Sequence, residues 1–228
     1  MRMTGKNIVV IGGSTGIGKS VAQELRSLGA NLFLYSKSGD GTTALDVTED
    51  NPSFEGLPEV IDGLVYCPGT IKLKPFHRLS IEDFQSDMDV NFFGAVKALQ
   101  ACLRGLKKSD SGSVVLFSTV AVQMGMGFHA GIASAKGAVE GLTRSLAAEW
   151  APQKIRVNAI APSLTDTPLA SQLLSTPEKK EASDKRHPLG RVGTPEDMSK
   201  ASIYLLSEDS SWMTGQILHI DGGMSVVR

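Results

Sequence analysis

The stretch Ile8-Val9-Val10-Ile11-Gly12-Gly13-Ser14-Thr15-Gly16-Ile17-Gly18 decides the fold of this chain. Its four apolar residues are typical of a buried strand, and they run directly into a glycine-rich turn. Residues 19–28 then show the helical spacing of apolar side chains, and Gly29 is a suitable end for that helix. A glycine turn at a helix N-terminus presents backbone N–H groups and a partial positive charge. The stretch therefore predicts a pyrophosphate site, and a turn without a ligand is the alternative.

Length and composition favour one globular domain. The chain has 228 residues, of which 41% are hydrophobic, so we expect a single domain over residues 1–228. Its 23 basic and 24 acidic residues give a net charge of −1, which offers no electrostatic basis for binding nucleic acid or an anionic membrane. The two cysteines, Cys67 and Cys102, are too few for a disulfide framework. With no apolar leader or membrane-spanning run expected, we predict a cytoplasmic protein.

Strand and helix patterns alternate along the chain. Strands are expected at residues 8–11, 31–35, 44–47, within 60–66, and at 113–117, 155–160 and 217–220. Helices are expected at residues 19–28, 80–105, 133–150 and 195–206. Continuous apolar strands are typical of a parallel sheet covered on both faces, so the pattern predicts a Rossmann-like, doubly wound α/β fold. Only residues 36–43 separate the second and third strands, which is too short for the usual crossover helix.

Further motifs follow the glycine turn in a fixed order. They are Asp46-Val47, Asp89-Val90-Asn91, Ser118-Thr119, Lys136, residues 162–167, residues 188–197, Thr214-Gly215-Gln216 and Asp221-Gly222-Gly223. With the Gly-x-x-x-Gly-x-Gly turn, this set resembles the short-chain dehydrogenase/reductase family over essentially the whole chain. The resemblance implies an oxidoreductase that transfers a hydride between a nicotinamide cofactor and a small carbonyl or alcohol substrate. It also implies a homodimer or homotetramer.

The resemblance assigns cofactor contacts position by position. The pyrophosphate and adenosine ribose would contact Gly12, Ser14, Thr15, Gly16, Ile17 and Gly18, and the adenine would contact Asp46 and Val47. The rest of the groove would be formed by Cys67, Pro68, Gly69, Asn91, Lys136, Pro162, Ser163, Leu164, Thr165 and Thr167. Ser163 stands where the family usually has glycine. Residues from about 167 to 191 would form a helical lid over the substrate.

The end of the second strand bears on the choice between NADP(H) and NAD(H). A carboxylate there would accept a hydrogen bond from a ribose 2′-hydroxyl and repel a 2′-phosphate. This chain has Ser36-Lys37-Ser38 at that place, with no carboxylate before Asp40. One cation and two hydroxyls suit a phosphate, so the sequence favours NADP(H). An ordinary surface role for Lys37 is the alternative.

The catalytic positions depart from the family at one residue. The family's acid/base tyrosine lies four residues before its lysine, and counting back from Lys136 gives Ile132. Thr119 aligns with the catalytic serine and keeps a hydroxyl for a substrate carbonyl. A positioned proton donor contributes about 10²- to 10⁴-fold in rate, so a replacement is needed. The candidates are His129, which precedes the helix, and Lys136 acting with a ribose hydroxyl or water. The resemblance also implies that Asn91 fixes a helix distortion and a water chain.

Three readings of the site remain open from the sequence. The first is an NADP(H)-dependent oxidoreductase with an atypical proton donor. The second is a sensor or partner subunit that binds NADP(H) without chemistry, which Ile132 favours. The third retains the cofactor for a reaction that needs no tyrosine, such as isomerisation. We expect no metal site, because His77, His187 and His219 lie in separate segments without metal-ligand spacing.

Overall fold

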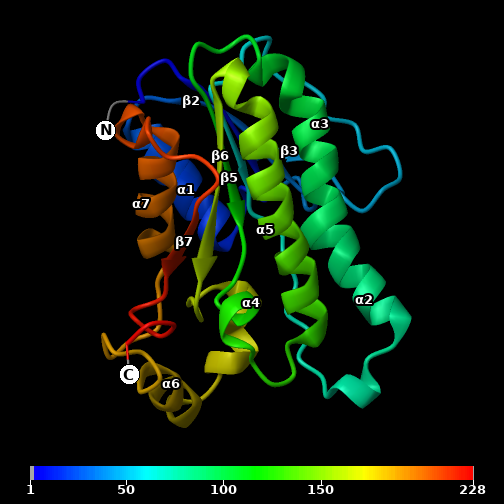
Figure 1. Ribbon diagram of the computed structural model, residues 1–228, viewed down its shortest axis with the longest axis vertical. Coiled ribbons are helices and arrows are strands. Elements are labelled where there is room, and N and C mark those ends of the chain that lie inside the picture. Colours follow the sequence, from blue (N-terminus) through cyan, green and yellow to red (C-terminus); the bar gives the residue numbers. More distant parts are fainter. Residues whose placement is uncertain (1–2, 228) are drawn as a thin grey trace.

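The computed structural model describes residues 3–227 and contains one parallel sheet of seven strands (Figure 1). The strand order across the sheet is β3-β2-β1-β4-β5-β6-β7. The strands are β1 (Asn7–Ile11), β2 (Asn31–Ser36), β3 (Thr43–Ala44), β4 (Gly63–Tyr66), β5 (Gly112–Phe117), β6 (Ile155–Pro162) and β7 (Ile217–Ile220). The doubly wound α/β fold predicted from the apolar strands is therefore confirmed.

Helices cover both faces of the sheet. The α-helices are α1 (Gly16–Ser27), α2 (Ile81–Met88), α3 (Gly94–Leu106), α4 (Ala121–Met124), α5 (Ala130–Trp150), α6 (Pro177–Asp184) and α7 (Pro195–Leu206). Helices α1 and α7 pack together on one face, where Val21, Leu25 and Ile203 join the core, while α3 and α5 cover the other (Figure 1). Burying both faces explains why the central strands read as continuous apolar runs. No helix within residues 3–227 is long and apolar enough to span a membrane.

The helix expected over residues 80–105 is interrupted. It consists of α2, a π-helical turn (Asp89–Phe93) and α3. Within the turn, the amide nitrogen of Asn91 donates to the carbonyl oxygen of Asp87 at 2.8 Å. A side chain that occupies a backbone acceptor in this way competes with the regular helical ladder. The start of α2 agrees with the prediction, because Ser80 and Asp83 form a reciprocal capping box.

The third strand is shorter than predicted. The sequence indicated residues 44–47, whereas β3 pairs with β2 only at Thr43 and Ala44. The chain then turns, since the Asp46 carboxylate accepts a hydrogen bond from the backbone N–H of Thr48 at 3.0 Å. The connection from β2 to β3 is a turn, which confirms that the crossover helix is missing.

The remaining helix boundaries differ by a few residues. Helix α1 begins at Gly16 rather than Lys19, and α5 begins at Ala130 rather than Ala133. Short 3-10 helices complete the chain at Phe76–Arg78, Ala151–Gln153, Pro168–Leu174 and Glu208–Ser210. The segment from Pro168 to Asp184, which includes α6, lies beyond the carboxyl ends of the strands (Figure 1).

Candidate active site

Two adjoining hollows lie along the carboxyl edge of the sheet. The glycine-turn hollow has a volume of about 520 Å³ and is lined by residues 11, 12 and 14–18 and by the loops after β2, β3 and β4. The lysine hollow, of about 290 Å³, contains Lys136 and the loops after β4, β5 and β6. The two share the side chains or backbone of Ile17, Cys67, Gly69, Thr167 and Leu169. They therefore form one groove, with parallel strands supplying their carboxyl ends to it, as ligand sites in this fold class do.

The glycine turn at one end of the groove is tightly packed at Gly12 and Gly18. Gly12 has φ +81°, and its N–H donates to the carbonyl oxygen of Tyr35 at 2.7 Å. A Cβ added at Gly18 would overlap the carbonyl oxygen of Gly12, so helix α1 packs directly on the turn. Gly16, with φ +52°, begins α1 and directs its first N–H groups toward the hollow. This arrangement of exposed backbone donors at a helix N-terminus fits a pyrophosphate.

The positions predicted for the cofactor line these hollows. The glycine-turn hollow is lined by Gly12, Ser14, Thr15, Gly16, Ile17, Gly18, Ser36, Lys37, Ser38, Asp46, Val47, Cys67, Pro68, Gly69 and Thr167. The lysine hollow is lined by Lys136, Pro162, Ser163, Leu164 and Thr165, together with the candidate catalytic residues Thr119 and His129. Asn91 is fully buried and lies behind Gly69, where an added Cβ would be 3.3 Å from the Asn91 side-chain oxygen.

An ion pair crosses the far end of the glycine-turn hollow. Lys37 Nζ lies 2.7 Å from Asp46 Oδ2, and the lysine side chain is otherwise exposed. Hydrogen bonds from Lys37 and from Thr48 lower the pKa of Asp46 to about 2. Ser36 is buried and its hydroxyl lies 2.7 Å from that of Thr42. The cation predicted to meet a 2′-phosphate is thus held at the hollow by a carboxylate that the sequence assigned to the adenine.

Lys136 lies at the floor of the lysine hollow. Its side chain is buried, and burial lowers the pKa of the ammonium group to about 8, although negative charge at Cys67 or Asp87 acts in the opposite direction. Burial also raises the pKa of the Cys67 thiol to about 12, so this thiol is neutral at physiological pH. A Cβ added at Gly69 would lie 3.8 Å from Lys136 Nζ, which shows that the loop after β4 passes close to the ammonium group.

The other candidate catalytic residues surround this lysine. Thr119 is half-buried, and its hydroxyl oxygen accepts from the N–H of Ala121 at 3.3 Å. The neighbouring Ser118 also lines the hollow, but its hydroxyl donates to Glu140 at 2.7 Å. Ile132 is buried and lines the same hollow. Thr119 is therefore the hydroxyl at the end of β5 that remains available to a substrate.

His129 lies at the rim of the lysine hollow, at the N-cap of α5. Its Nδ1 is 2.6 Å from the carbonyl oxygen of Gly127, so Nδ1 carries a proton and donates. In the neutral ring Nε2 is then an acceptor, and only the imidazolium form of His129 has a proton to transfer from Nε2.

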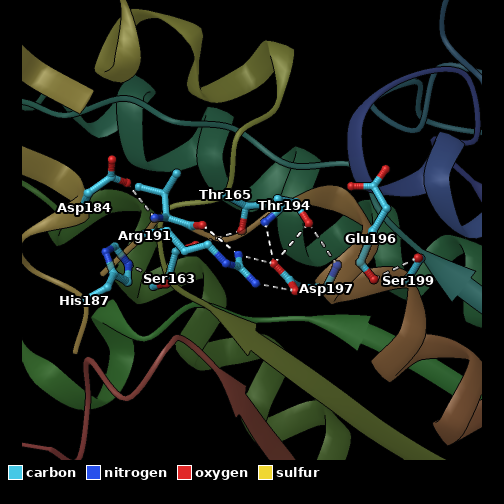
Figure 2. A network of polar contacts seen from close by, with 10 residues as sticks. Ser163, Thr165, Asp184, His187, Arg191, Thr194, Glu196, Asp197 and Ser199 are labelled. Carbon is cyan, nitrogen blue, oxygen red and sulfur yellow. Dashed lines mark hydrogen bonds and ion pairs between the residues drawn. The ribbon is translucent and has the colours of Figure 1, made fainter. Parts of the chain in front are cut away.

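The structure brings His187 into the site, which the sequence did not predict. His187 is buried, its Nδ1 lies 2.8 Å from the carbonyl oxygen of Ser183, and its Nε2 lies 2.9 Å from Ser163 Oγ (Figure 2). Because a carbonyl oxygen can only accept, Nδ1 donates and Nε2 accepts from the Ser163 hydroxyl. The serine that stands in place of glycine after β6 is thereby joined to the segment that follows α6.

The same segment is anchored to helix α7. Arg191 donates two parallel hydrogen bonds to the carboxylate of Asp197, at 2.6 and 2.9 Å, and Asp197 accepts from the N–H of Thr194 at 2.8 Å (Figure 2). Asp184 accepts from the N–H of Val192 at 2.8 Å. The pair with Arg191 holds the pKa of Asp197 well below its usual range. Residues 184–197 are thus held together by internal hydrogen bonds, and the contact between His187 and Ser163 joins them to the groove.

Two further residues under the groove were missed by sequence reasoning. Thr70 lines the lysine hollow, and its hydroxyl donates to Asp87 Oδ1 at 2.5 Å. Asp87 is fully buried in α2. One sequence signal was available, because Asp87 precedes Asn91 by four residues and so shares its helix face.

Comparisons with known proteins agree with this geometry. A family model described as enoyl-(acyl carrier protein) reductase matches residues 11–225. A tropinone reductase homologue of Arabidopsis thaliana is 35% identical and covers 98% of this chain and 94% of its own. The ligand-free aldohexose dehydrogenase of Thermoplasma acidophilum superposes with a TM-score of 0.92 at 28% identity, covering 99% of this chain and 96% of that chain.

A gluconate 5-dehydrogenase of Burkholderia cenocepacia, in complex with NADP and tartrate, gives a TM-score of 0.90 at 27% identity. That match covers 100% of this chain and 98% of the dehydrogenase. Sequence relatives and solved structures thus both extend over nearly the whole length. The chain belongs to the short-chain dehydrogenase/reductase family of oxidoreductases.

Proposed function

We propose that this protein is an NADP(H)-dependent oxidoreductase that interconverts a small carbonyl compound and its alcohol. The observation that carries the proposal is the single groove that joins the glycine turn to Lys136 and Thr119. A bound nicotinamide cofactor would supply or accept the hydride. The chain would bind the pyrophosphate on the N–H groups before α1 and hold the substrate oxygen at the Thr119 hydroxyl.

NADP(H) is favoured over NAD(H) by the residues after β2. Lys37, Ser36 and Ser38 all line the glycine-turn hollow, and Lys37 extends into solvent from its edge. An ammonium group in this position attracts a 2′-phosphate, although Asp46 already neutralises part of its charge. The related gluconate 5-dehydrogenase is described in complex with NADP, which agrees with this choice.

Lys136 is the proton donor that the geometry supports best. It lies inside the hollow, and its pKa is lowered to about 8. At neutral pH the ammonium group therefore still carries its proton, but it releases this proton more readily than an ordinary lysine does. In reduction, an N–H bond of the ammonium group breaks and an O–H bond of the alcohol forms, either directly or through a water or ribose hydroxyl. His129 is the second candidate, because it borders the same hollow, but it transfers a proton only as imidazolium.

The walls of the lysine hollow indicate the class of substrate. They are mostly apolar, with Ile71, Leu73, Met126, Leu173 and Met224 among the lining side chains. We infer a predominantly apolar carbonyl substrate, covered by a lid of residues from about 167 to 191 that is tied down through His187 and Arg191. We further propose a single domain over residues 1–228, a homodimer or homotetramer, and a cytoplasmic location, where the free thiols of Cys67 and Cys102 would remain reduced.

The experiment is NADPH oxidation over a broad panel of carbonyl compounds with native protein, Lys136→Met and His129→Ala. Turnover by the native protein and His129→Ala, with loss in Lys136→Met, is the expected result. Loss of turnover in His129→Ala alone would identify His129 as the proton donor instead.

A sensor without chemistry is the second candidate function, and Ile132 is the observation that favours it. Native protein that binds NADPH tightly but reduces no member of the panel would support this second function. Retained turnover in both variants would contradict each proposed donor.

A further inference from the structure

A buried polar cluster surrounds Asp87 beneath the lysine hollow. Its Oδ1 accepts the 2.5 Å hydrogen bond from the Thr70 hydroxyl, and its backbone carbonyl accepts from the Asn91 amide at 2.8 Å. The same amide nitrogen donates to Thr70 Oγ1 at 2.9 Å. Asp87 has no measurable exposure, and its second oxygen, Oδ2, is buried without a hydrogen-bond partner among residues 3–227. A carboxyl group in this position is costly, so its retention calls for an explanation.

The free oxygen of Asp87 faces the start of helix α5. A Cβ added at Gly131 would lie 2.6 Å from Asp87 Oδ2, so the absence of a side chain at Gly131 makes room for the carboxylate. Gly131 directly precedes Ile132, and Lys136 follows little more than one turn later on the same helix. On its other side the cluster borders the ammonium group, because a Cβ added at Gly69 would lie 3.3 Å from Asn91 Oδ1 and 3.8 Å from Lys136 Nζ. A carboxylate in this cluster favours the charged form of Lys136.

We propose that Asp87 is a positioning residue that keeps Lys136 protonated, and that the pair of Asp87 and Lys136 replaces the pair of tyrosine and lysine found in relatives. This inference rests on the proposed function, since it explains how a chain with isoleucine at position 132 retains a proton donor. Thr70 and Asn91 hold the carboxylate in place through the hydrogen bonds described above.

The charged groups around Lys136 support this role. Burial acts against the ammonium form, and only a nearby negative charge offsets it. The Cys67 thiol also faces Lys136, but its pKa of about 12 leaves it neutral at physiological pH. Asn91 contributes a neutral amide oxygen near Gly69. Asp87 is the buried carboxyl group of this cluster, and in the proposal it supplies the negative charge that favours the ammonium form of Lys136.

The proton balance of the step is simple. During reduction Lys136 gives one proton to the alkoxide oxygen and becomes a neutral amine. Solvent returns a proton to this amine before the next turnover. Asp87 contributes by making the ammonium form of Lys136 more favourable, so that the amine is reprotonated at neutral pH.

The test is a direct titration of Lys136 that does not depend on turnover. Protein labelled with ¹³C at lysine Cε is titrated by NMR, and the Lys136 signal is assigned by its disappearance in Lys136→Met. Asp87→Asn is compared with native protein, and Asp89→Asn removes a neighbouring carboxylate outside the cluster as a matched control. Asp87→Ala provides a second variant in case the amide disturbs packing.

We expect both Asp87 variants to lower the midpoint of the Lys136 titration by about one pH unit or more, with no change in Asp89→Asn. An unchanged midpoint in folded Asp87→Asn or Asp87→Ala would overturn the proposal. Because the readout is the lysine signal itself, the result stands even if the carbonyl panel shows no turnover. Where turnover is found, the alkaline limb of its pH profile should shift downward in the same variants.

Discussion

Lys37 Nζ lies 2.7 Å from Asp46 Oδ2, which ties the loop after β2 to the turn after β3. The residues after the second strand predicted that the lysine meets a 2′-phosphate, whereas the family resemblance implied that the aspartate contacts the adenine. Their pairing means that a phosphate must compete with Asp46 for the ammonium group. We therefore propose that the two residues together set the cofactor preference.

Replacing Lys37 should change the preference between cofactors. We predict that Lys37→Ala weakens NADPH binding by about tenfold, or about 1.4 kcal/mol, and leaves NADH binding nearly unchanged. Asp46→Asn should act in the opposite direction, because it frees the ammonium group. Fluorescence titration of the bound nicotinamide measures both, with exposed Lys107→Ala as control. If Lys37→Ala lost the same binding affinity for NADPH and for NADH, the assignment of Lys37 to a 2′-phosphate would be contradicted.

The glycine turn offers a matched pair of substitutions. A Cβ at Gly18 would overlap the carbonyl oxygen of Gly12, whereas a Cβ at Gly13 would make ordinary contact with Leu34 at 3.4 Å. Gly18→Ala should therefore abolish cofactor binding and lower the melting temperature, while Gly13→Ala retains both. Calorimetric titration with NADPH and thermal unfolding check this. Tight binding by Gly18→Ala would show that the close packing of α1 on the turn is not required.

Burial of Lys136 predicts a dependence of stability on pH. Its pKa is about 8 in the folded protein against 10.5 ordinarily, so the unfolded chain binds more protons between these values. Native protein should therefore gain stability relative to Lys136→Met as pH rises from about 8 to about 10.5, by of the order of 3 kcal/mol. Urea unfolding of both proteins across this range measures the difference. The surface variant Lys107→Met is the control, and its difference in unfolding free energy from native protein should not change with pH. If the difference for Lys136→Met were equally independent of pH, the lowered pKa of Lys136 would be refuted.

Position 132 can be used to restore the family's proton donor. Ile132 is buried and lines the lysine hollow, four residues before Lys136. We predict that Ile132→Tyr raises the rate of reduction by about tenfold or more, because a positioned phenol is a good general acid. Ile132→Phe adds nearly the same volume without the hydroxyl and should give no gain. Equal steady-state rates for Ile132→Tyr and Ile132→Phe would contradict the view that the lack of a phenolic proton donor limits turnover.

The sequence predicted the order of the elements well where local signals were strong. Helix α7 begins and ends as expected, because Thr194 and Asp197 form the capping box that the sequence shows. Strand β7 also has the predicted bounds. The third strand is shorter than predicted because Asp46 turns the chain. The helical span over residues 80–105 agrees with the prediction, and its distortion lies at Asn91, whose amide bonds to Asp87 in the π-helical turn. The short strand and the π-helical turn both depend on side chains that bond to backbone groups, which hydrophobic spacing does not reveal.

The groove itself was predictable only in part. Residues that follow strand ends were found, since their position on the chain fixes their place at the carboxyl edge. His187 and Asp87 were missed, because His187 reaches Ser163 across 24 residues and Asp87 reaches Thr70 across 17. Such contacts depend on how α6 and α2 pack against the sheet edge.

The measurement that tests the central claim most directly is the rate of NADPH-dependent carbonyl reduction between about pH 6 and pH 10. If Lys136 supplies the proton, the native rate should fall as pH rises through about 8, and Lys136→Met should show only a small residual rate. His129→Ala should keep the native profile. A native rate that instead falls near neutrality, where histidine side chains titrate, and a His129→Ala variant without activity would contradict the account.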